Sequence, residues 1–170
     1  FKKIIDETFD YAIEVHLYNW GEPTLNKHLI KMLKYCSEKN IWTRISTNLS
    51  LDFKDEYIEE LLLSGLDLLH VDLDGLDQKV YEKYRKKGNI DLVYKNLEKI
   101  KKIKKKHNLQ LPLIEISMLA MKQNEHQHKE FLNSKKKLGA DVVQIDKIQH
   151  NPNMDEGWLP ENKDLVYRTY

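Results

Sequence analysis

Cysteine is almost absent from this 170-residue chain, whose single thiol is Cys36. One cysteine excludes a disulfide framework and a zinc site built from thiolates, so we expect the reducing cytoplasm as its compartment. We interpret Cys36 as a buried structural thiol and predict no metal ligand within this chain. Long apolar runs are also lacking. None approaches the ~20 residues of a bilayer span, and no signal-peptide pattern is present, so we expect no membrane partner.

An excess of charge of one sign is lacking too. Lys and Arg number 28 against 27 Asp and Glu, a formal net charge of +1, which argues against a dedicated nucleic-acid binder. The lysine-rich segment 94–108 could form a basic patch, but an apolar stripe runs through it at Leu97, Ile100 and Ile103. We interpret its lysines as the solvated side of a helix and expect no nucleic-acid partner.

Hydrophobic periodicity predicts a regular alternation of helices and strands. The expected strands are 12–18, 41–47, 68–74, 111–119 and 141–148, and the expected helices are 1–10, 26–39, 54–64, 77–106 with a break at 86–89, and 124–139. Gly65 and Gly139 are expected to stop helices, and Asn124 to cap the last one with Gln127 three residues on. This alternation favours parallel strands joined by right-handed crossovers.

Polar residues fall on one parity of every predicted strand. The pairs are Glu14 and His16, Arg44 and Ser46, His70 and Asp72, Glu115 and Ser117, and Gln144 and Asp146. A parallel sheet covered by helices on both faces should be apolar throughout. We therefore favour helices on one side only, with a polar lumen on the other, as in a full or partial barrel. The alternative is a helix-covered sheet with a few satisfied buried polar groups.

The predicted carboxyl ends of the strands carry clusters of hydrogen-bonding residues. These read NWGEP (19–23), STN (46–48), DLDG (72–75), MKQN (121–124) and DKIQ (146–149). Gly21 permits a positive φ, and Pro23 biases Glu22 towards an extended conformation. A carboxylate and backbone carbonyls held at such a turn suit a ligand ammonium group. Asn48 and Asp72 can bond hydroxyls or amines.

Together these motifs resemble the radical S-adenosylmethionine superfamily, and within it the peptide- and protein-modifying enzymes with a C-terminal SPASM-type extension. NWGEPTL is similar to the family's Gly-Gly-Glu-Pro motif, with Trp20 in place of the first glycine. The other matching positions are Thr47 and Asn48 at a strand end, DLDG with Asp72 where serine is usual and with Asp74, Arg85 after that strand, and Asn124 after the next. The resemblance covers residues 4–148.

The resemblance implies a parallel α/β fold, a partial (β/α)6-type barrel with about five β/α units present and the first strand and cluster loop missing. It implies a core at 1–148 and a linker at 149–170 toward a missing C-terminal extension. It places the amino group of S-adenosylmethionine at the turn of Gly21, Glu22 and Pro23. It assigns the ligand's other polar atoms to Thr47, Asn48, Asp72, Asp74 and Asn124, and its carboxylate to Arg85. Glu115, which shares the polar parity of its strand with Ser117, is a further candidate to bond ligand hydroxyls. The resemblance names no catalytic acid or base.

The family's reaction needs a [4Fe-4S] cluster on three cysteines in a loop after the first strand, which this chain lacks. By resemblance that loop precedes Phe1, and the chain by itself is not expected to assemble the cluster or to catalyse. The resemblance implies a full-length enzyme that makes a 5′-deoxyadenosyl radical, with a peptide or small-molecule substrate and an electron donor such as flavodoxin or ferredoxin. A peptide or protein side chain is the first expectation.

Two other functions stay open at this point. The chain could belong to a different barrel enzyme, such as an aldolase or isomerase using strand-end carboxylates for acid–base work. It could also be a non-catalytic barrel that serves as a binding scaffold. A Cys-x3-Cys-x2-Cys segment upstream of Phe1 would favour the radical enzyme over both.

Overall fold

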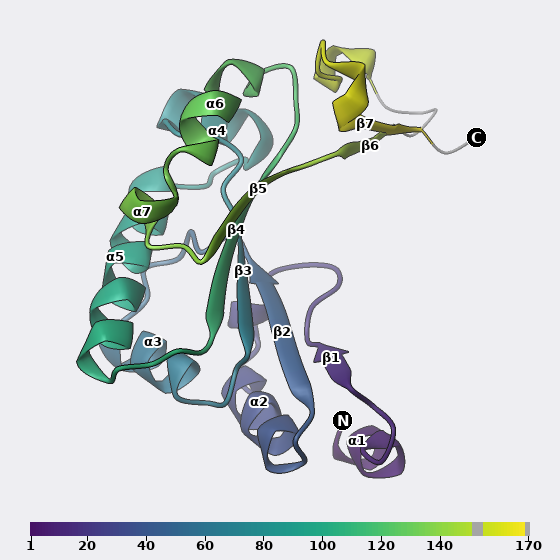
Figure 1. The fold of residues 1–170 in the computed structure, drawn as a ribbon, viewed down its shortest axis with the longest axis vertical. Coiled ribbons are helices and arrows are strands. Elements are labelled where there is room, and N and C mark those ends of the chain that lie inside the picture. Colours follow the sequence, from purple (N-terminus) through teal and green to yellow (C-terminus); the bar gives the residue numbers. More distant parts are fainter. Residues whose placement is uncertain (151–154, 169–170) are drawn as a thin grey trace.

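The computed structural model describes residues 1–150 and 155–168 and contains a five-stranded parallel sheet flanked by helices (Figure 1). Its strands are β1 (Glu14–His16), β2 (Trp42–Thr47), β3 (Leu68–Asp72), β4 (Leu113–Leu119) and β5 (Val142–Asp146), side by side in chain order. Every neighbouring pair is parallel, so the chain crosses back between successive strands. The predicted α/β fold with parallel strands is confirmed.

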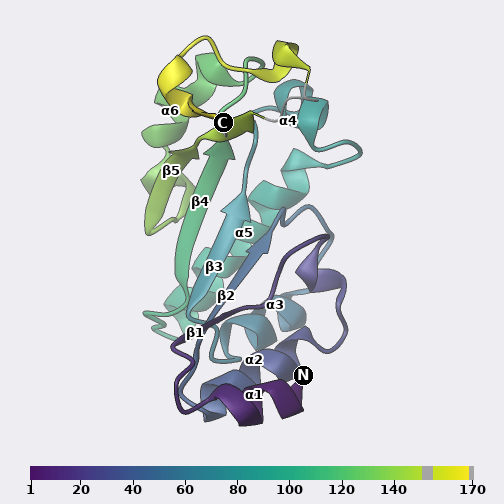
Figure 2. The same ribbon diagram turned by 90° about the vertical axis from the view of Figure 1, so that its right-hand side faces the viewer.

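Helices cover one face of this sheet. The helices of the described chain are α1 (Lys2–Thr8), which lies below β1 in Figure 1, and α2 (Leu29–Glu38), α3 (Asp55–Leu62), α4 (Gln78–Tyr84), α5 (Ile90–Lys106), α6 (His128–Leu132) and α7 (Lys135–Leu138). Figure 1 shows α2, α3, α5 and α7 on the same side of the strands. In Figure 2 α2, α3 and α5 lie behind the strands, whose other face is turned to the viewer. This one-sided arrangement is the one that the parity of polar residues predicted.

The core lies between the sheet and these helices. On the covered face the side chains of the central strands are fully buried, with Ile45, Leu69, Val71, Ile116 and Met118 each 0% exposed. They pack in one cluster with apolar residues of α2, α3 and α5. Burying one such side chain stabilises the fold by about 1.5–3 kcal/mol, so this layer fixes the strands that carry the site.

Several element ends fall where the sequence predicts them. The long helical region breaks between Tyr84 and Ile90, and the Asn89 side chain accepts hydrogen bonds from the first backbone N–H groups of α5. Gly65 and Gly139 follow α3 and α7 with φ of 82° and 68°, values that suit glycine at a helix stop.

The helix expected at 26–39 begins later, at Leu29. Residues Pro23–Leu25 form a separate 3-10 turn, η1, because the Glu22 side chain accepts a hydrogen bond from the Thr24 backbone N–H and Pro23 starts the turn. The strand expected at 12–18 is likewise only three residues long. It is paired with β2 alone and lies at the edge of the sheet.

Asn124 takes the predicted N-cap position, but in front of a short 3-10 turn and without a side-chain cap. No side-chain cap hydrogen bond is present at Asn124, and the segment divides into a 3-10 turn η2 (Glu125–Gln127), α6 and α7. The Asn124 amide is occupied elsewhere: it donates to the carbonyls of Asp74 and Leu119 and accepts from the Met121 N–H. A side chain used for tertiary contacts is not available to the helix end.

The strand expected at 141–148 ends at Asp146, and a second short strand follows. This strand, β6 (Ile148–His150), pairs in parallel with β7 (Val166–Arg168), with the 3-10 turns η3 (Glu156–Trp158) and η4 (Lys163–Leu165) between them. The described part of the expected linker 149–170 therefore contains regular structure that no hydrophobic period indicated. Residues 151–154 and 169–170 of that linker lie outside the described residues, and the domain boundary at 148 stays a prediction.

None of the helices in the described ranges is both long enough and apolar enough to cross a bilayer.

Candidate functional site

A pocket of about 450 Å³ lies at the carboxyl ends of β1, β2 and β3, next to the C-terminal end of α4. Its lining consists of Tyr18, Asn19, Trp20, Gly21, Glu22, Ser46, Asn48, Asp72, Tyr84 and Arg85. Five of the predicted site residues are in this set, and they come from segments up to 64 positions apart in the sequence (Gly21 to Arg85). The carboxyl ends of parallel strands meet at one edge of a sheet, which is why these loops converge.

The Gly-Glu-Pro turn is held in place by its own carboxylate. Gly21 has φ of 91°, the left-handed region that its sequence position predicted. Glu22 Oε1 accepts from the hydroxyls of Thr24 at 2.6 Å and Thr47 at 2.7 Å, and Oε2 accepts from the Asn48 N–H at 2.9 Å. Glu22 thus ties the turn after β1 to the end of β2. A carboxylate oxygen accepts more than one bond, so Oε2 retains capacity for a ligand N–H.

Thr47 does not line the pocket. Its side chain is buried, and its hydroxyl donates to Glu22 from the side away from the pocket. The same hydroxyl accepts from the Leu49 N–H. Pro23 is not in the lining either, since it starts η1. These two predicted residues therefore shape the turn.

A guanidinium between two aspartates forms the far wall of the pocket. Arg85 Nε lies 2.5 Å from Asp74 Oδ2, and its terminal Nη2 lies 3.6 Å from Asp72 Oδ1. Ser46 donates to the other oxygen of Asp72 at 2.7 Å. Burial lowers the pKa of Arg85, but the two carboxylates outweigh burial and raise the net pKa, so the side chain is a stable cation.

The two aspartates differ in their own titration. Burial alone would raise the pKa of Asp72, yet His70, Arg85 and Ser46 together bring it below its usual value. Burial dominates at Asp74, whose pKa is raised despite the bond to Arg85. Asp72 is thus the firmly ionised carboxylate that faces the pocket. Asp74 is only 1% exposed and lies behind it.

Asn124 lies behind the pocket with Asp74. It is 0% exposed and donates to the Asp74 carbonyl at 3.2 Å, while Asp74 Oδ1 accepts from the Leu119 N–H at 2.9 Å. The structure therefore brings Asn124 and Asp74 together with Arg85. These three residues form a polar cluster that joins the ends of β3 and β4 to α4.

Glu115 lies away from the pocket on the uncovered face of the sheet. Its Oε1 is 2.7 Å from His70 Nδ1 and 3.3 Å from Gln144 Nε2, and His70 Nε2 is 3.0 Å from the Ser117 hydroxyl. Burial lowers the pKa of His70, but the neighbouring carboxylates of Asp72 and Glu115 outweigh burial and raise it. The polar residues that share one strand parity thus form a hydrogen-bonded network on the uncovered face of the sheet, which extends towards Asp72.

Sequence reasoning did not propose the aromatic residues of the pocket. Tyr18 and Trp20 stand in the same loop as Gly21, and Tyr84 directly precedes Arg85. Proximity to predicted ligand-binding positions was the one signal that could have found them. Trp20, which occupies the place of a glycine in the resembling motif, is 96% exposed at the pocket rim.

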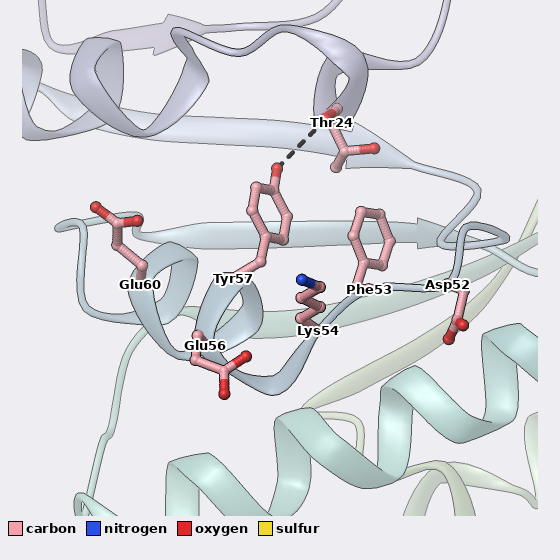
Figure 3. A pocket seen from close by; sticks show the side chains of 7 residues that line it. All are labelled: Thr24, Asp52, Phe53, Lys54, Glu56, Tyr57 and Glu60. Carbon is pink, nitrogen blue, oxygen red and sulfur yellow. Dashed lines mark hydrogen bonds between the residues drawn. The ribbon is translucent and has the colours of Figure 1, made fainter.

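A second cavity, also about 450 Å³, lies between η1 and α3 (Figure 3). The rings of Phe53 and Tyr57 stack in it with centroids 5.1 Å apart, and the Tyr57 hydroxyl donates to the Thr24 carbonyl at 3.5 Å. It contains none of the predicted site residues. Its contact with Thr24 supports the turn that holds Glu22.

The residues of this chain do not fit an iron–sulfur cluster. Such clusters are held by several cysteine thiolates, three in the family that the sequence resembles, and this chain has one cysteine. Cys36 is fully buried between α1 and the start of β2, beside Ile5 and Ile41, and burial raises the pKa of its thiol to about 11. The interpretation of Cys36 as a structural thiol is confirmed. Within 1–150 and 155–168 no three His, Cys, Asp or Glu side chains group as metal ligands.

Comparison with known proteins places this chain in a family. The model of the Radical SAM superfamily matches residues 1–134. The chain belongs to the radical SAM superfamily. Its curated relatives carry the names of enzymes, so this is an enzyme family, and the family name implies S-adenosylmethionine as the cofactor.

Two curated relatives of this radical SAM chain are a probable GTP 3′,8-cyclase of Methanococcus maripaludis and the PqqA peptide cyclase of Bradyrhizobium diazoefficiens. The first is 27% identical over 152 residues, which is 89% of this chain and 49% of the relative. The second is 24% identical over 169 residues, which is 99% of this chain and 41% of the relative. The chain thus spans less than half the length of either.

Among solved structures, Streptococcus suis SuiB bound to S-adenosylmethionine superposes with a TM-score of 0.70 at 20% identity, over 89% of this chain and 34% of SuiB. SuiB has also been solved bound to its precursor peptide SuiA. At this identity the likeness shows the fold, and it confirms the parallel α/β architecture predicted from the sequence.

Proposed function

We propose that this chain is the S-adenosylmethionine-binding part of a radical SAM enzyme. The observation that carries the proposal is the convergence of Glu22, Asn48, Asp72 and Arg85 on one pocket at the carboxyl ends of β1, β2 and β3. Scattered positions would have left the motifs without a common ligand. When bound, S-adenosylmethionine supplies a 5′-deoxyadenosyl radical for hydrogen abstraction, at the expense of one electron from a [4Fe-4S] cluster.

The pocket matches the charges of this ligand. Glu22 Oε2 can accept from the ligand ammonium, since it takes one bond within the protein. Arg85 uses Nε for Asp74, and its Nη2 is 3.6 Å from Asp72, beyond hydrogen-bond range, which leaves terminal N–H groups for the ligand carboxylate. Asp72 accepts well from sugar hydroxyls and would repel a carboxylate, so we assign it to the sugar. Asn48 completes the polar lining.

The single buried thiol does not supply a cluster. We place the cluster ligands, and the electron donor such as flavodoxin or ferredoxin, outside this chain, and we propose the cytoplasm as the compartment.

For the substrate we propose a peptide or protein side chain. Similarity to the PqqA peptide cyclase extends over 99% of the chain and includes the tail after residue 148, whereas similarity to the GTP cyclase covers 89%. The tail is the predicted linker toward a SPASM-type extension, so a match that includes it supports the peptide-modifying branch. The higher identity to the GTP cyclase keeps a purine nucleotide as the second candidate.

The test uses the full-length protein, reconstituted with iron and sulfide without oxygen, and measures 5′-deoxyadenosine by chromatography together with S-adenosylmethionine affinity. We expect Arg85→Gln to weaken binding about 10- to 100-fold, the size of a lost charged hydrogen bond. Lys102→Ala, on the outer helix α5, is the control and should bind normally. A protein with its cluster verified by absorbance that neither binds nor cleaves S-adenosylmethionine would refute the proposal.

The substrate proposal has its own experiment. Precursor-type peptides encoded beside the gene and GTP are supplied separately, and each is analysed by mass spectrometry after reaction. A loss of two hydrogens or a new cross-link in a peptide supports the first candidate. Conversion of GTP alone would transfer the assignment to the second.

A further inference from the structure

The tail after the sheet reaches back to the rim of the pocket. The rings of Trp158, in η3, and Tyr84, at the end of α4, meet edge to face with centroids 5.9 Å apart and an interplanar angle of 65°. The Trp158 carbonyl accepts from the Lys122 N–H at 3.1 Å. A side chain 74 positions beyond Tyr84 thus packs on a residue that lines the pocket.

Tyr84 in turn lies against the cation of the pocket. The Arg85 guanidinium carbon is 5.3 Å from the centre of the Tyr84 ring, within the range of a cation–π contact. Tyr84 is 42% exposed, and the ring contact with Trp158 restricts the rotamers open to it. A long arginine side chain keeps several rotamers open unless its neighbours restrict it.

A second contact holds the tail at Glu125, next to the polar cluster of Asp74, Arg85 and Asn124. Both carboxylate oxygens of Glu125 accept backbone N–H groups of the tail, from Glu161 at 2.8 Å and from Asn162 at 2.9 Å. Its neighbour Asn124 donates to the carbonyl of Asp74, whose carboxylate holds Arg85 Nε. Two chains of contacts therefore connect the tail with Arg85. One runs through the rings of Trp158 and Tyr84, and the other through Glu125, Asn124 and Asp74.

We propose that Trp158 is a positioning residue for the cofactor pocket: through Tyr84 it holds Arg85 in the orientation that binds the ligand carboxylate. The tail 155–168 then helps to shape the cofactor pocket, in addition to serving as the predicted linker. This inference rests on the proposed function, because it assigns the carboxylate of S-adenosylmethionine to Arg85. It predicts that binding depends on a segment that none of the strand-end motifs includes.

The first experiment measures S-adenosylmethionine affinity by equilibrium dialysis and stability by thermal unfolding. Trp158→Ala should weaken binding about 3- to 10-fold, the worth of one aromatic pair, with little change in the unfolding midpoint. Trp158→Phe keeps an aromatic edge and should restore most of the affinity. Tyr167→Ala removes an exposed aromatic residue of the same tail and should bind like the unaltered protein.

A double-mutant cycle separates positioning from general support of the fold. If Trp158 acts through Tyr84, Trp158→Ala should add almost nothing to the loss already caused by Tyr84→Ala. An equal loss of affinity in both backgrounds would overturn the inference, as would unchanged binding by Trp158→Ala alone.

Hydrogen exchange provides a readout that needs no ligand. The Gly88 N–H donates to the Arg85 carbonyl at 2.8 Å, and its exchange should accelerate in Trp158→Ala but not in Tyr167→Ala. If the unaltered protein fails to bind S-adenosylmethionine, the proposed function fails, and this measurement still decides whether Trp158 orders the turn at Arg85. Unchanged exchange at Gly88 would then overturn the inference.

Discussion

The two faces of the central sheet are built from the same strands and are held by different forces. On the face covered by α2, α3 and α5, apolar side chains such as Ile45, Val71 and Ile116 are fully buried against the helices. On the uncovered face, seen in Figure 2, His70, Glu115 and other polar side chains are held by one another. The covered face provides stability, and the uncovered face holds polar groups at fixed positions while leaving them reachable.

The difference shows how a barrel-type enzyme separates folding from chemistry. Burial on one face stabilises the fold without any requirement on the other, so the second face is free to carry charges. The charges near the site are nevertheless paired: Asp72 with Ser46 and Arg85, and Glu115 with His70. Pairing keeps a charged face rigid enough to orient a ligand.

The largest effect is expected on the covered face. Ile116→Ala should lower the free energy of unfolding by about 2–5 kcal/mol, because it removes buried methyl groups and leaves a cavity. Ile116→Val should cost only about 0.5–1.5 kcal/mol. Gln144→Ala, on the uncovered face, should cost less than about 1.5 kcal/mol, since it loses weak, partly solvated hydrogen bonds. Urea unfolding measures all three. Equal losses for Ile116→Ala and Gln144→Ala would contradict this contrast between the faces.

The next effect concerns Asp74, which has the same strand parity as the polar residues of the uncovered face but is itself buried. Asp74→Asn keeps an acceptor for the Leu119 N–H but loses the negative charge that faces Arg85. We expect a loss of about 1–3 kcal/mol in unfolding free energy, the range for one unsatisfied buried group. Asp91→Asn, at the exposed start of α5, is the matched control. A variant Asp74→Asn as stable as the control would mean that the buried pair contributes nothing.

A smaller effect is a dependence of stability on pH at His70. Its pKa is raised above the ordinary value because Asp72 and Glu115 outweigh the effect of burial. A group with a raised pKa in the folded state contributes stability that is complete below its unfolded pKa, about 6.5. That contribution is lost as pH rises through the folded pKa. The imidazole resonance of His70, followed by NMR, should therefore titrate above the ordinary histidine value of about 6.5, and His70→Gln should remove the corresponding fall in stability. A His70 pKa at or below the ordinary histidine value would contradict this.

Most of the fold could be predicted from the sequence, because period and parity report burial directly. Alternating polar residues on five strands predicted a sheet covered on one face, and Gly65 and Gly139 marked helix ends by their conformational freedom. The failures occurred where a side chain serves the tertiary structure. Asn124 looks like a helix cap, but its amide binds the ends of β3 and β4. The β6–β7 pair is too short to show a period.

The candidate site was predictable as a set of strand ends and less so residue by residue. Strand-end motifs found Gly21, Glu22 and Asn48. The parity of Arg44 and Ser46 already places Thr47 on the covered face. Asp74, in contrast, shares the parity of Asp72 and is nevertheless buried behind the pocket. That distinction depends on the twist and closure of the sheet at its carboxyl edge. The contact between Tyr84 and Trp158 has no local signal at all, because it joins two segments 74 residues apart.

The smallest effect concerns Trp20, which belongs to neither face of the sheet. It is 96% exposed at the pocket rim, so Trp20→Gly removes almost no buried area and should lower the unfolding free energy by less than about 1 kcal/mol. The substitution also produces the Gly-Gly-Glu-Pro sequence of the resembling motif. A flexible glycine before Gly21 raises the entropy of the unfolded turn, which is a second reason to expect a slight loss and no gain. Thermal unfolding with Leu25→Ala as an exposed control measures the change. A loss above about 1.5 kcal/mol would show that Trp20 packs on the described chain after all, since only a buried large side chain costs that much to remove.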